Sequence, residues 1–246
     1  KQTAHNVDCF TTVSEITDTE CKQLLEKPAD VVLMNGFEDD FVPKGSTFAD
    51  KRKRARAAML RVANSLLGTD LDDSTLILGT SGRYEFKNKG IDVFIESLQQ
   101  LNNDETLTRN VLAFINVPAW MKEPRKDLHD RLKSREHYDT PLEMPYLTHW
   151  LNDANNDRVL RLINNLGIAN SKEDKVKLIF VPCYLDGKDG IFDKQYYDLL
   201  LGQDMSIYPS YYEPWGYTPL ESIAFAVPTV TTDLAGFGLW VNSLGK

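Results

Sequence analysis

Two glutamates, Glu213 and Glu221, lie in the stretch of this sequence whose residue types most clearly suggest chemistry. The stretch runs Pro209-Ser-Tyr-Tyr-Glu-Pro-Trp-Gly-Tyr-Thr-Pro-Leu-Glu221, and its loop from Ser210 to Thr218 joins a predicted strand to a predicted helix. Loops of this kind bind ligands in open α/β sheets. The free N–H groups at the start of a helix favour an anion, most commonly phosphate. The stretch therefore predicts a loop that binds a phosphate-bearing ligand.

Short patterns on either side predict the elements that position this loop. The run from Met205 to Tyr208 is apolar and β-prone, which predicts a short buried strand. Residues from Leu220 onward predict a helix, with Pro219 at its first position and the Thr218 hydroxyl as its cap. The simpler alternative is a tight turn with two solvated acids on a capped helix. The aromatic residues, prolines and glycine around Glu213 make that alternative the weaker one.

A second loop carries two cations in the same kind of position. Thr75 to Ser81 predicts a buried strand that runs directly into a basic loop, and an amphipathic helix begins at Ile91. Arg83 offers a planar fork of donors and Lys89 a point charge, while a glycine at each end of the loop lets the backbone approach a ligand. The alternative is an ordinary loop whose charges face water. From the residues alone the two interpretations have similar weight.

The two loops together resemble a known family. Glu-Pro-x-Gly followed by a second Glu is similar to the sugar-nucleotide signature of retaining glycosyltransferases with two Rossmann-like domains. The longer string Pro-Ser-Tyr-Tyr-Glu-Pro-Trp-Gly-Tyr-Thr-Pro and the loop Gly-Arg-Tyr-Glu-Phe-x-Asn-Lys-Gly resemble the glycogen synthases of the animal and fungal type. The N-terminal text Phe-Thr-Thr-Val-Ser is also similar. The resemblance extends over essentially the whole chain.

The resemblance implies a retaining glucosyltransferase that moves glucose from UDP-glucose to the non-reducing end of an α-1,4-glucan. It implies catalytic roles for Glu213, which would stabilise positive charge at the anomeric carbon, and for Arg83 and Lys89, which would hold the diphosphate. It implies that Glu221 binds the ribose hydroxyls and that Tyr196 stacks on the uracil. The remaining implied substrate-binding residues are Trp215, Gly216, Tyr217 and Thr218. It implies neither a metal nor a cofactor, because the cations are protein groups.

Composition and charge limit the other classes. The chain has 246 residues, of which 42% are hydrophobic, and a formal net charge of −8. The acidic balance argues against nucleic acid or an anionic membrane as the main partner. There is no apolar run of membrane-spanning length and no signal peptide pattern. Three widely spaced cysteines fit no metal motif and no disulfide framework, so we expect a cytoplasmic location.

Strands alternate with helices along the chain, and the strands are mostly apolar. This pattern predicts an α/β fold with a doubly wound, parallel, Rossmann-like sheet, here the C-terminal half of a two-domain glycosyltransferase. We interpret residues 1–30 as the tail of an N-terminal domain that is otherwise missing. Residues 31–246 then form the nucleotide-sugar-binding domain, with a helical insert at about 121–170.

Several local predictions concern the rest of the chain. Residues 46–67 predict one long helix whose basic run, 51–56, is interpreted as a solvated face. Residues 193–201 predict another helix, and 235–238 a tight turn. The three histidines of the insert lack the spacing of a metal pair and are expected on the surface; they are His129, His137 and His149. The family uses a longer helical insert at this place for subunit contacts. Because the insert is shorter here, the sequence leaves open whether the chain forms a homo-oligomer.

A second class of function is a nucleotide-sugar binding module without catalysis. In the family the N-terminal domain supplies the opposite wall of the cleft, which this sequence lacks. We therefore expect the isolated chain to bind UDP weakly and to transfer no glucose. An interaction protein that has lost catalysis is disfavoured, because both glutamates, Arg83 and Lys89 are all present.

Overall fold

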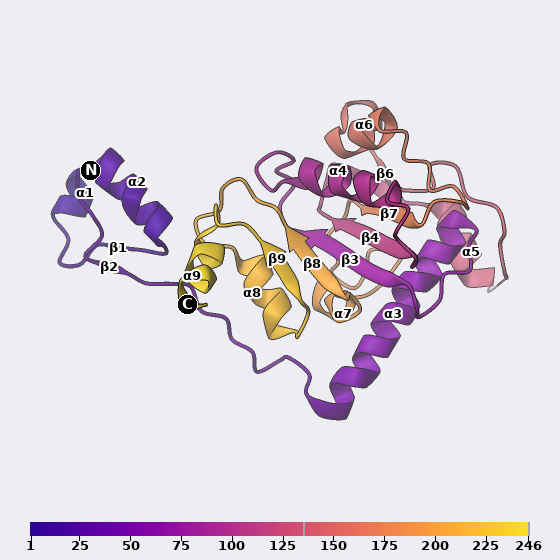
Figure 1. Ribbon diagram of the computed structural model, residues 1–246, viewed down its shortest axis with the longest axis horizontal. Helices are drawn as coiled ribbons and strands as arrows, with labels where there is room; N and C mark the ends of the chain where they lie inside the picture. The colour runs from indigo at the N-terminus through magenta and orange to yellow at the C-terminus, as the bar shows by residue number, and fades with distance from the viewer. Residues whose placement is uncertain (135, 246) are drawn as a thin grey trace.

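The computed structural model describes residues 1–134 and 136–245. Its centre is a five-stranded sheet in the order β7-β4-β3-β8-β9, in which every pairing is parallel (Figure 1). The strands are β3 (Leu76–Ser81), β4 (Val111–Asn116), β7 (Val176–Val181), β8 (Met205–Tyr208) and β9 (Thr229–Thr231). The predicted α/β fold with a parallel sheet is confirmed.

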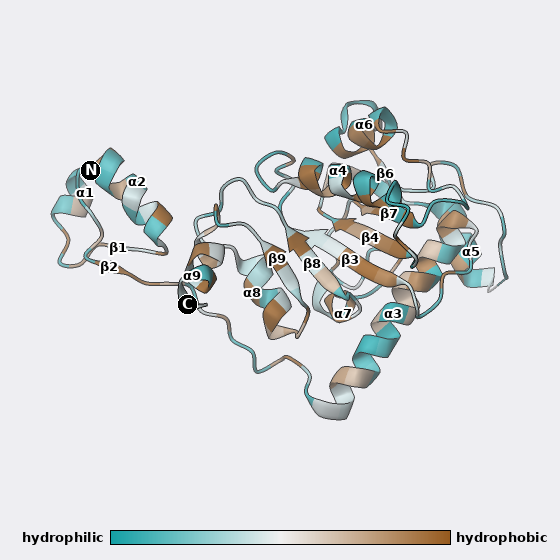
Figure 2. Ribbon diagram, in the orientation of Figure 1, coloured by the Kyte–Doolittle hydropathy of each residue, from teal (hydrophilic) through white to brown (hydrophobic). Residues whose placement is uncertain are grey.

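Helices cover both faces of this sheet. α3 (Gly45–Leu67) and α7 (Tyr196–Leu200) pack on one face, and α4 (Ile91–Asn102) and α6 (Arg158–Asn165) on the other. All residues of β4 and β7 are buried, as expected for parallel strands covered on two sides, and Figure 2 shows the hydrophobic residues along the central strands. The side chains of β4 alternate between two cores because successive residues point to opposite faces.

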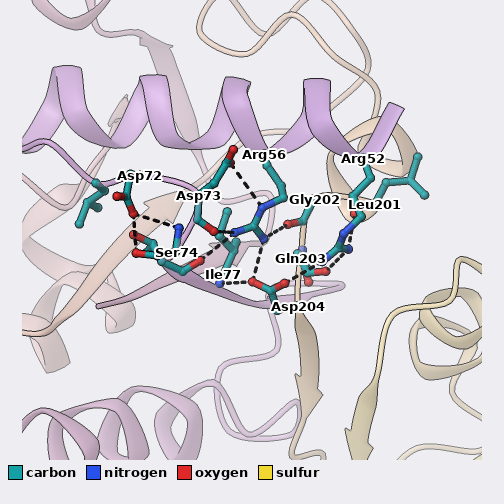
Figure 3. Close-up of polar contacts among 12 residues, drawn as sticks. Arg52, Arg56, Asp72, Asp73, Ser74, Ile77, Leu201, Gly202, Gln203 and Asp204 are labelled. Carbon is teal, nitrogen blue, oxygen red and sulfur yellow. Dashed lines mark hydrogen bonds and ion pairs between the residues drawn. The ribbon is translucent and has the colours of Figure 1, made fainter. Parts of the chain in front are cut away.

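The basic run of α3 anchors the helix to the sheet, so the prediction of a solvated face is wrong for two of its residues. Arg52 and Arg56 both pair with the carboxylate of Asp204, at 2.6 and 2.7 Å (Figure 3). Asp204 also accepts the backbone N–H of Ile77 at 2.8 Å. Arg52 donates to the carbonyls of residues 201 and 203, and Arg56 to those of 73, 75 and 202. This network joins α3 to the amino ends of β3 and β8.

The first 32 residues form a small unit of their own. It contains α1 (Gln2–His5), β1 (Thr11–Thr12), α2 (Glu15–Leu25) and β2 (Val31–Val32), and its two strands pair in parallel. Both strands are two residues long, and the Ser14 hydroxyl caps α2 by accepting the backbone N–H of Thr17. Figure 1 shows this unit beside α9 (Gly236–Leu244), away from the central sheet.

The insert is only partly helical. α5 (Lys126–Ser134) and α6 lie within it, but β5 (Met121–Pro124) and β6 (His149–Leu151) form an antiparallel pair, followed by a 3₁₀ turn at Ala154–Asn156. His149 is fully buried, so the prediction of a surface histidine is wrong for this residue. The pairing of β6 with β5 and the packing of this segment against β7 enclose it.

Two shorter predictions also differ from the structure. The predicted helix at 193–201 is limited to α7, and the predicted turn at 235–238 is the beginning of α9. Within the described ranges, no helix combines the length and the apolar character needed to cross a membrane.

Candidate functional site

The strand order places a crevice between two neighbouring strands. The chain passes from β3 outward to β4 and β7, and then returns to the other side of β3 with β8 and β9. Such a reversal leaves an opening at the carboxyl ends of the two central strands, where ligands bind in open α/β sheets. The loop of residues 82–90 follows β3, and the loop of residues 209–216 follows β8. Both predicted loops therefore lie at this edge.

The two loops are in direct contact. The backbone N–H of Tyr211 donates to the carbonyl of Asn88 at 2.8 Å. Gly90 has a φ of 64°, in the left-handed region, and a β-carbon at this position would overlap the carbonyl of Pro209. Glycine is thus required at position 90 both for its backbone conformation and for the close approach of the loops.

An ion pair between Lys89 and Glu213 joins the loops through their side chains. The two side chains are only 15% and 17% exposed. Burial lowers the pKa of Lys89, and the nearby Arg83 lowers it further, while Glu85 acts in the opposite direction. A charge in such a position is costly without a partner, so each member of the pair depends on the other or on a ligand.

The backbone of Glu213 is fixed to the start of α9. The carbonyl of Glu213 accepts the N–H of Gly236 at 3.0 Å, and the carbonyl of Trp215 accepts the N–H of Phe237 at 2.7 Å. The Trp215 ring is buried against Phe237 and Trp240, and its indole N–H has no partner within the described parts of the chain. Trp215 therefore packs between this loop and α9 and stabilises the position of the loop.

A pocket of about 370 Å³ opens at the same edge. Three of the predicted residues line it together: Arg83, Tyr196 and Thr218. Arg83 is 75% exposed and pairs with Glu85 at 3.1 Å. Tyr184, which follows the carboxyl end of β7, also lines the pocket and is largely exposed. We did not predict Tyr184, although its place directly after a strand was a usable signal.

Tyr196 and Tyr197 connect the pocket to Glu221. The Tyr196 hydroxyl lies 2.7 Å from the Ser81 hydroxyl, and burial raises its pKa well above the usual value. Tyr197 stacks on Phe225 and donates to a Glu221 oxygen at 2.9 Å. Burial raises the pKa of Glu221, and the hydrogen bond from Tyr197 opposes this shift. Glu221 is therefore a half-buried carboxyl with a fixed orientation.

The start of α8 (Tyr217–Ala224) differs from the prediction. Its N-cap is Gly216, with φ 106°, and no side chain caps it; Thr218 is the second helical residue. The Thr218 hydroxyl is thus not the cap, because the glycine allows the chain to enter the helix two residues earlier. The first backbone N–H groups of a helix have no partner within the helix. Without a side-chain cap they are available to an anion, next to the exposed ring of Tyr217.

One group of side chains has the types of a metal site. His149, Cys183 and Asp189 are buried with their ligand atoms within 4.8 Å of one another. Hydrogen bonds already use most of these atoms: Asp189 accepts the backbone N–H groups of residues 191–193, and His149 lies 3.0 Å from the carbonyl of Asp189 and 2.8 Å from the Thr148 hydroxyl. Burial lowers the pKa of His149 and raises that of Cys183 to about 12. These hydrogen bonds explain the group as a structural cluster.

Comparison with known proteins identifies relatives over nearly the whole chain. The glycogen synthase family model matches residues 1–134 and 139–245. Glycogen [starch] synthase isoform 2 of Saccharomyces cerevisiae is 30% identical, over 98% of this chain and 43% of its own length. The liver glycogen [starch] synthase of Homo sapiens is 31% identical, over 98% of this chain and 42% of its own length. The chain thus spans less than half the length of these curated relatives.

Solved structures share the fold at low sequence identity. Sucrose-phosphate synthase from Thermosynechococcus elongatus aligns with a TM-score of 0.53 and 17% identity, over 96% of this chain and 43% of that one. Anabaena Alr3699/HepE, solved in complex with UDP and glucose, aligns with a TM-score of 0.54 and 14% identity, over 97% of this chain and 47% of that one. These likenesses support the Rossmann-like architecture.

Proposed function

Because the chain belongs to the glycogen synthase family, we propose that it is the donor-binding part of a retaining glucosyltransferase. The enzyme would transfer glucose from UDP-glucose to the non-reducing end of an α-1,4-glucan. The observation that carries this proposal is the contact between Lys89 and Glu213, which are 124 positions apart and belong to two separate motifs. Their loops meet at the reversal point of the sheet, beside the pocket that Arg83 lines.

The donor would lie along this edge with its diphosphate between the two loops. Arg83 supplies two parallel donors, Lys89 a point charge, and the start of α8 its free N–H groups. Tyr196 would contact the uracil and Glu221 the ribose hydroxyls, with Tyr217 and Thr218 beside the phosphates. The related fold solved with UDP and glucose supports a nucleotide sugar as the ligand class.

The proposed reaction uses charge stabilisation by protein groups. The bond between the anomeric carbon and a diphosphate oxygen breaks, and a bond to the 4-hydroxyl oxygen of the acceptor forms on the same face. The acceptor proton passes to the departing diphosphate. Arg83 and Lys89 stabilise the negative charge that leaves, and Glu213 stabilises the positive charge that develops on the sugar. Binding of a diphosphate would give Lys89 a second partner and loosen its pair with Glu213.

We further propose that the unit of residues 1–32 belongs to a second domain. Its own two-stranded sheet and its position beside α9 support this division, with the boundary two residues later than the sequence suggests. The rest of the chain would then be the nucleotide-sugar-binding domain. A cytoplasmic location, suggested by the cysteine pattern, and a homo-oligomer are retained as parts of the proposal.

Calorimetric titration with UDP tests the donor site. The variant Arg83→Ala should weaken UDP binding by about 10- to 100-fold, because a charge-assisted contact is lost. The matched control is Arg54→Ala, which removes an exposed arginine on α3 far from both loops in the sequence. Equal UDP affinity of both variants, or no UDP binding by the unsubstituted protein, would contradict the proposal.

A non-catalytic nucleotide-sugar module is the second candidate, favoured by the fact that Arg83, Lys89 and the start of α8 are groups suited to binding a diphosphate. A glucan-elongation assay on this chain alone distinguishes a catalytic from a non-catalytic chain, independently of whether the chain binds UDP. We expect UDP binding without elongation, because positioning of both substrates contributes on the order of 7–11 kcal/mol to such reactions and requires the opposite wall of the cleft. Elongation by the isolated chain would show that the catalytic groups all lie here.

A further inference from the structure

A second pocket, of about 560 Å³, lies on the other side of the 82–90 loop. Three segments line it: the loop after β3, the segment between β4 and β5, and the first residues of α6 with the 3₁₀ turn before it. The lining residues used below are Tyr84, Glu85, Asn88, Trp120, Asp153 and Asp157. We call this the Trp120 pocket. The donor site described above makes no use of it.

Trp120 presents a flat apolar surface to solvent. Its side chain is 73% exposed, and no aromatic ring or cation is paired with it among the described residues. Its backbone is held in place, since the carbonyl of Trp120 accepts the backbone N–H of Asn152 at 3.0 Å and its side-chain amide at 3.2 Å. An exposed aromatic ring on a hydrogen-bonded backbone, beside a pocket of this size, offers an apolar surface on which a ligand can pack.

The polar groups around the ring are mainly hydrogen-bond acceptors with fixed orientations. Glu85 pairs with Arg83 and accepts from the Asn88 amide at 2.8 Å. Asp157 accepts from the Tyr84 hydroxyl at 2.7 Å, and Asp153 binds the neighbouring amide of residue 156. The arrangement offers several carboxylate oxygens close to an apolar platform.

The charges in the pocket disfavour an anion. Three carboxylates line it, while the Lys87 ammonium is already paired with Asp92 and the exposed Arg158 supplies the remaining cation. A nucleotide or a nucleic acid could stack on the ring, but its phosphates would then face these carboxylates. A neutral ligand with many hydroxyl groups fits better, because hydroxyls donate to carboxylate oxygens.

We propose that the Trp120 pocket binds a segment of a neutral oligosaccharide chain. The C–H face of a pyranose ring packs on the negative face of the indole, and its hydroxyls donate to Glu85, Asp153 or Asp157. The identification of that chain as an α-glucan rests on the proposed function. The 82–90 loop carries Glu85 toward this pocket and Arg83 toward the donor pocket, so a glucan held here lies along the same edge of the sheet as the donor.

The experiment is a calorimetric titration of this chain with maltoheptaose, an α-1,4-glucan, and separately with UDP. Trp120→Ala should weaken maltoheptaose binding by about tenfold and leave UDP affinity unchanged. Trp120→Phe, which retains an aromatic ring, should keep most of the affinity. The control Leu24→Ala removes another exposed apolar side chain, on α2, and should change neither titration.

The outcomes separate this inference from the donor-site proposal. Equal maltoheptaose affinity of the unsubstituted protein and Trp120→Ala, or no maltoheptaose binding, would overturn the inference even if UDP binds as expected. Loss of UDP binding alone would contradict the donor site and leave the sugar pocket supported. Equal affinity for cellohexaose, the β-linked chain, would overturn the assignment to an α-glucan.

Discussion

Two clusters of cations and carboxylates lie at opposite ends of β3 and β8. At the amino ends, Asp204 receives Arg52, Arg56 and a backbone N–H, and both guanidinium groups also donate to backbone carbonyls. At the carboxyl ends, Lys89 and Glu213 form a single, partly buried pair beside the exposed Arg83.

The difference between the clusters lies in how fully each charge is satisfied. The amino-edge cluster uses most donors of its arginines within the protein, as a structural network does. The carboxyl-edge pair has one partner for each partly buried charge, and the neighbouring Arg83 lines an open pocket. A ligand with negative charge can therefore be accommodated at the second cluster and not at the first.

The largest expected effect is on stability at the amino edge. Asp204→Ala leaves two partly buried arginines and the Ile77 N–H without their carboxylate, so the free energy of unfolding should fall by about 3 kcal/mol. Urea denaturation measures this change. The control Asp73→Ala removes an exposed carboxylate 3.8 Å from Arg56 and should cost less than about 1 kcal/mol. Similar losses for both variants would mean that the network is not the anchor inferred here.

Much of this arrangement could be predicted from the sequence. The strands are apolar runs, and the carboxyl ends of parallel neighbours share an edge, so two motif loops that follow strands were expected together. The buried role of Arg52 and Arg56 also had a signal that we did not use. The two arginines continue the stripe of Met59 and Ala63 at spacings of four, three and four residues, and therefore lie on the core-facing side of α3.

Other features depend on tertiary packing and have no local signal. The strand order, with β8 beside β3, pairs residues that are distant in the sequence, such as Leu78 and Met205. His149 is buried because its strand packs against β7, and Trp120 is exposed because Asn152 holds its backbone at the surface. The sequence offers two possible starts for α8: Thr218, whose hydroxyl can cap a helix, and Gly216, which can adopt a positive φ. The structure uses Gly216, and the sequence alone does not decide between the two.

The next prediction concerns the carboxyl edge and is smaller. Lys89→Met alone leaves Glu213 buried without a partner and should destabilise the protein, whereas Lys89→Met combined with Glu213→Gln replaces the pair by neutral groups. The double variant should be as stable as the original, or more stable by up to about 2 kcal/mol, since buried ion pairs seldom contribute net stability. Urea denaturation of both variants gives the coupling between the sites.

The matching test at the amino edge is Arg56→Met combined with Asp204→Ala. Here the double substitution should not restore stability, because Arg52 and the Ile77 N–H remain without the carboxylate. Recovery at the amino edge, or failure to recover at the carboxyl edge, would remove the distinction between a structural network and a site prepared for a ligand.

The smallest expected effect is the dependence of donor binding on pH. Burial raises the pKa of Glu221 above its ordinary value, so this carboxyl becomes protonated at a higher pH in the folded protein than in the unfolded chain. Its contribution to folding stability is present below the unfolded pKa and is lost as pH rises through the folded pKa, because the charged form is the one that burial disfavours.

UDP binding should show the opposite trend. If Glu221 accepts hydrogen bonds from the ribose, UDP affinity falls as pH decreases through the raised pKa, by about tenfold at most. Glu221→Gln should remove this dependence while keeping a carbonyl acceptor for the Tyr197 hydroxyl. Titrations with UDP between about pH 4.5 and 7 measure the slope, with Glu105→Gln, which changes an exposed carboxylate between α4 and β4, as the control. An unchanged slope in Glu221→Gln would mean that the titrating group, and the ribose contact with it, lie elsewhere on the edge.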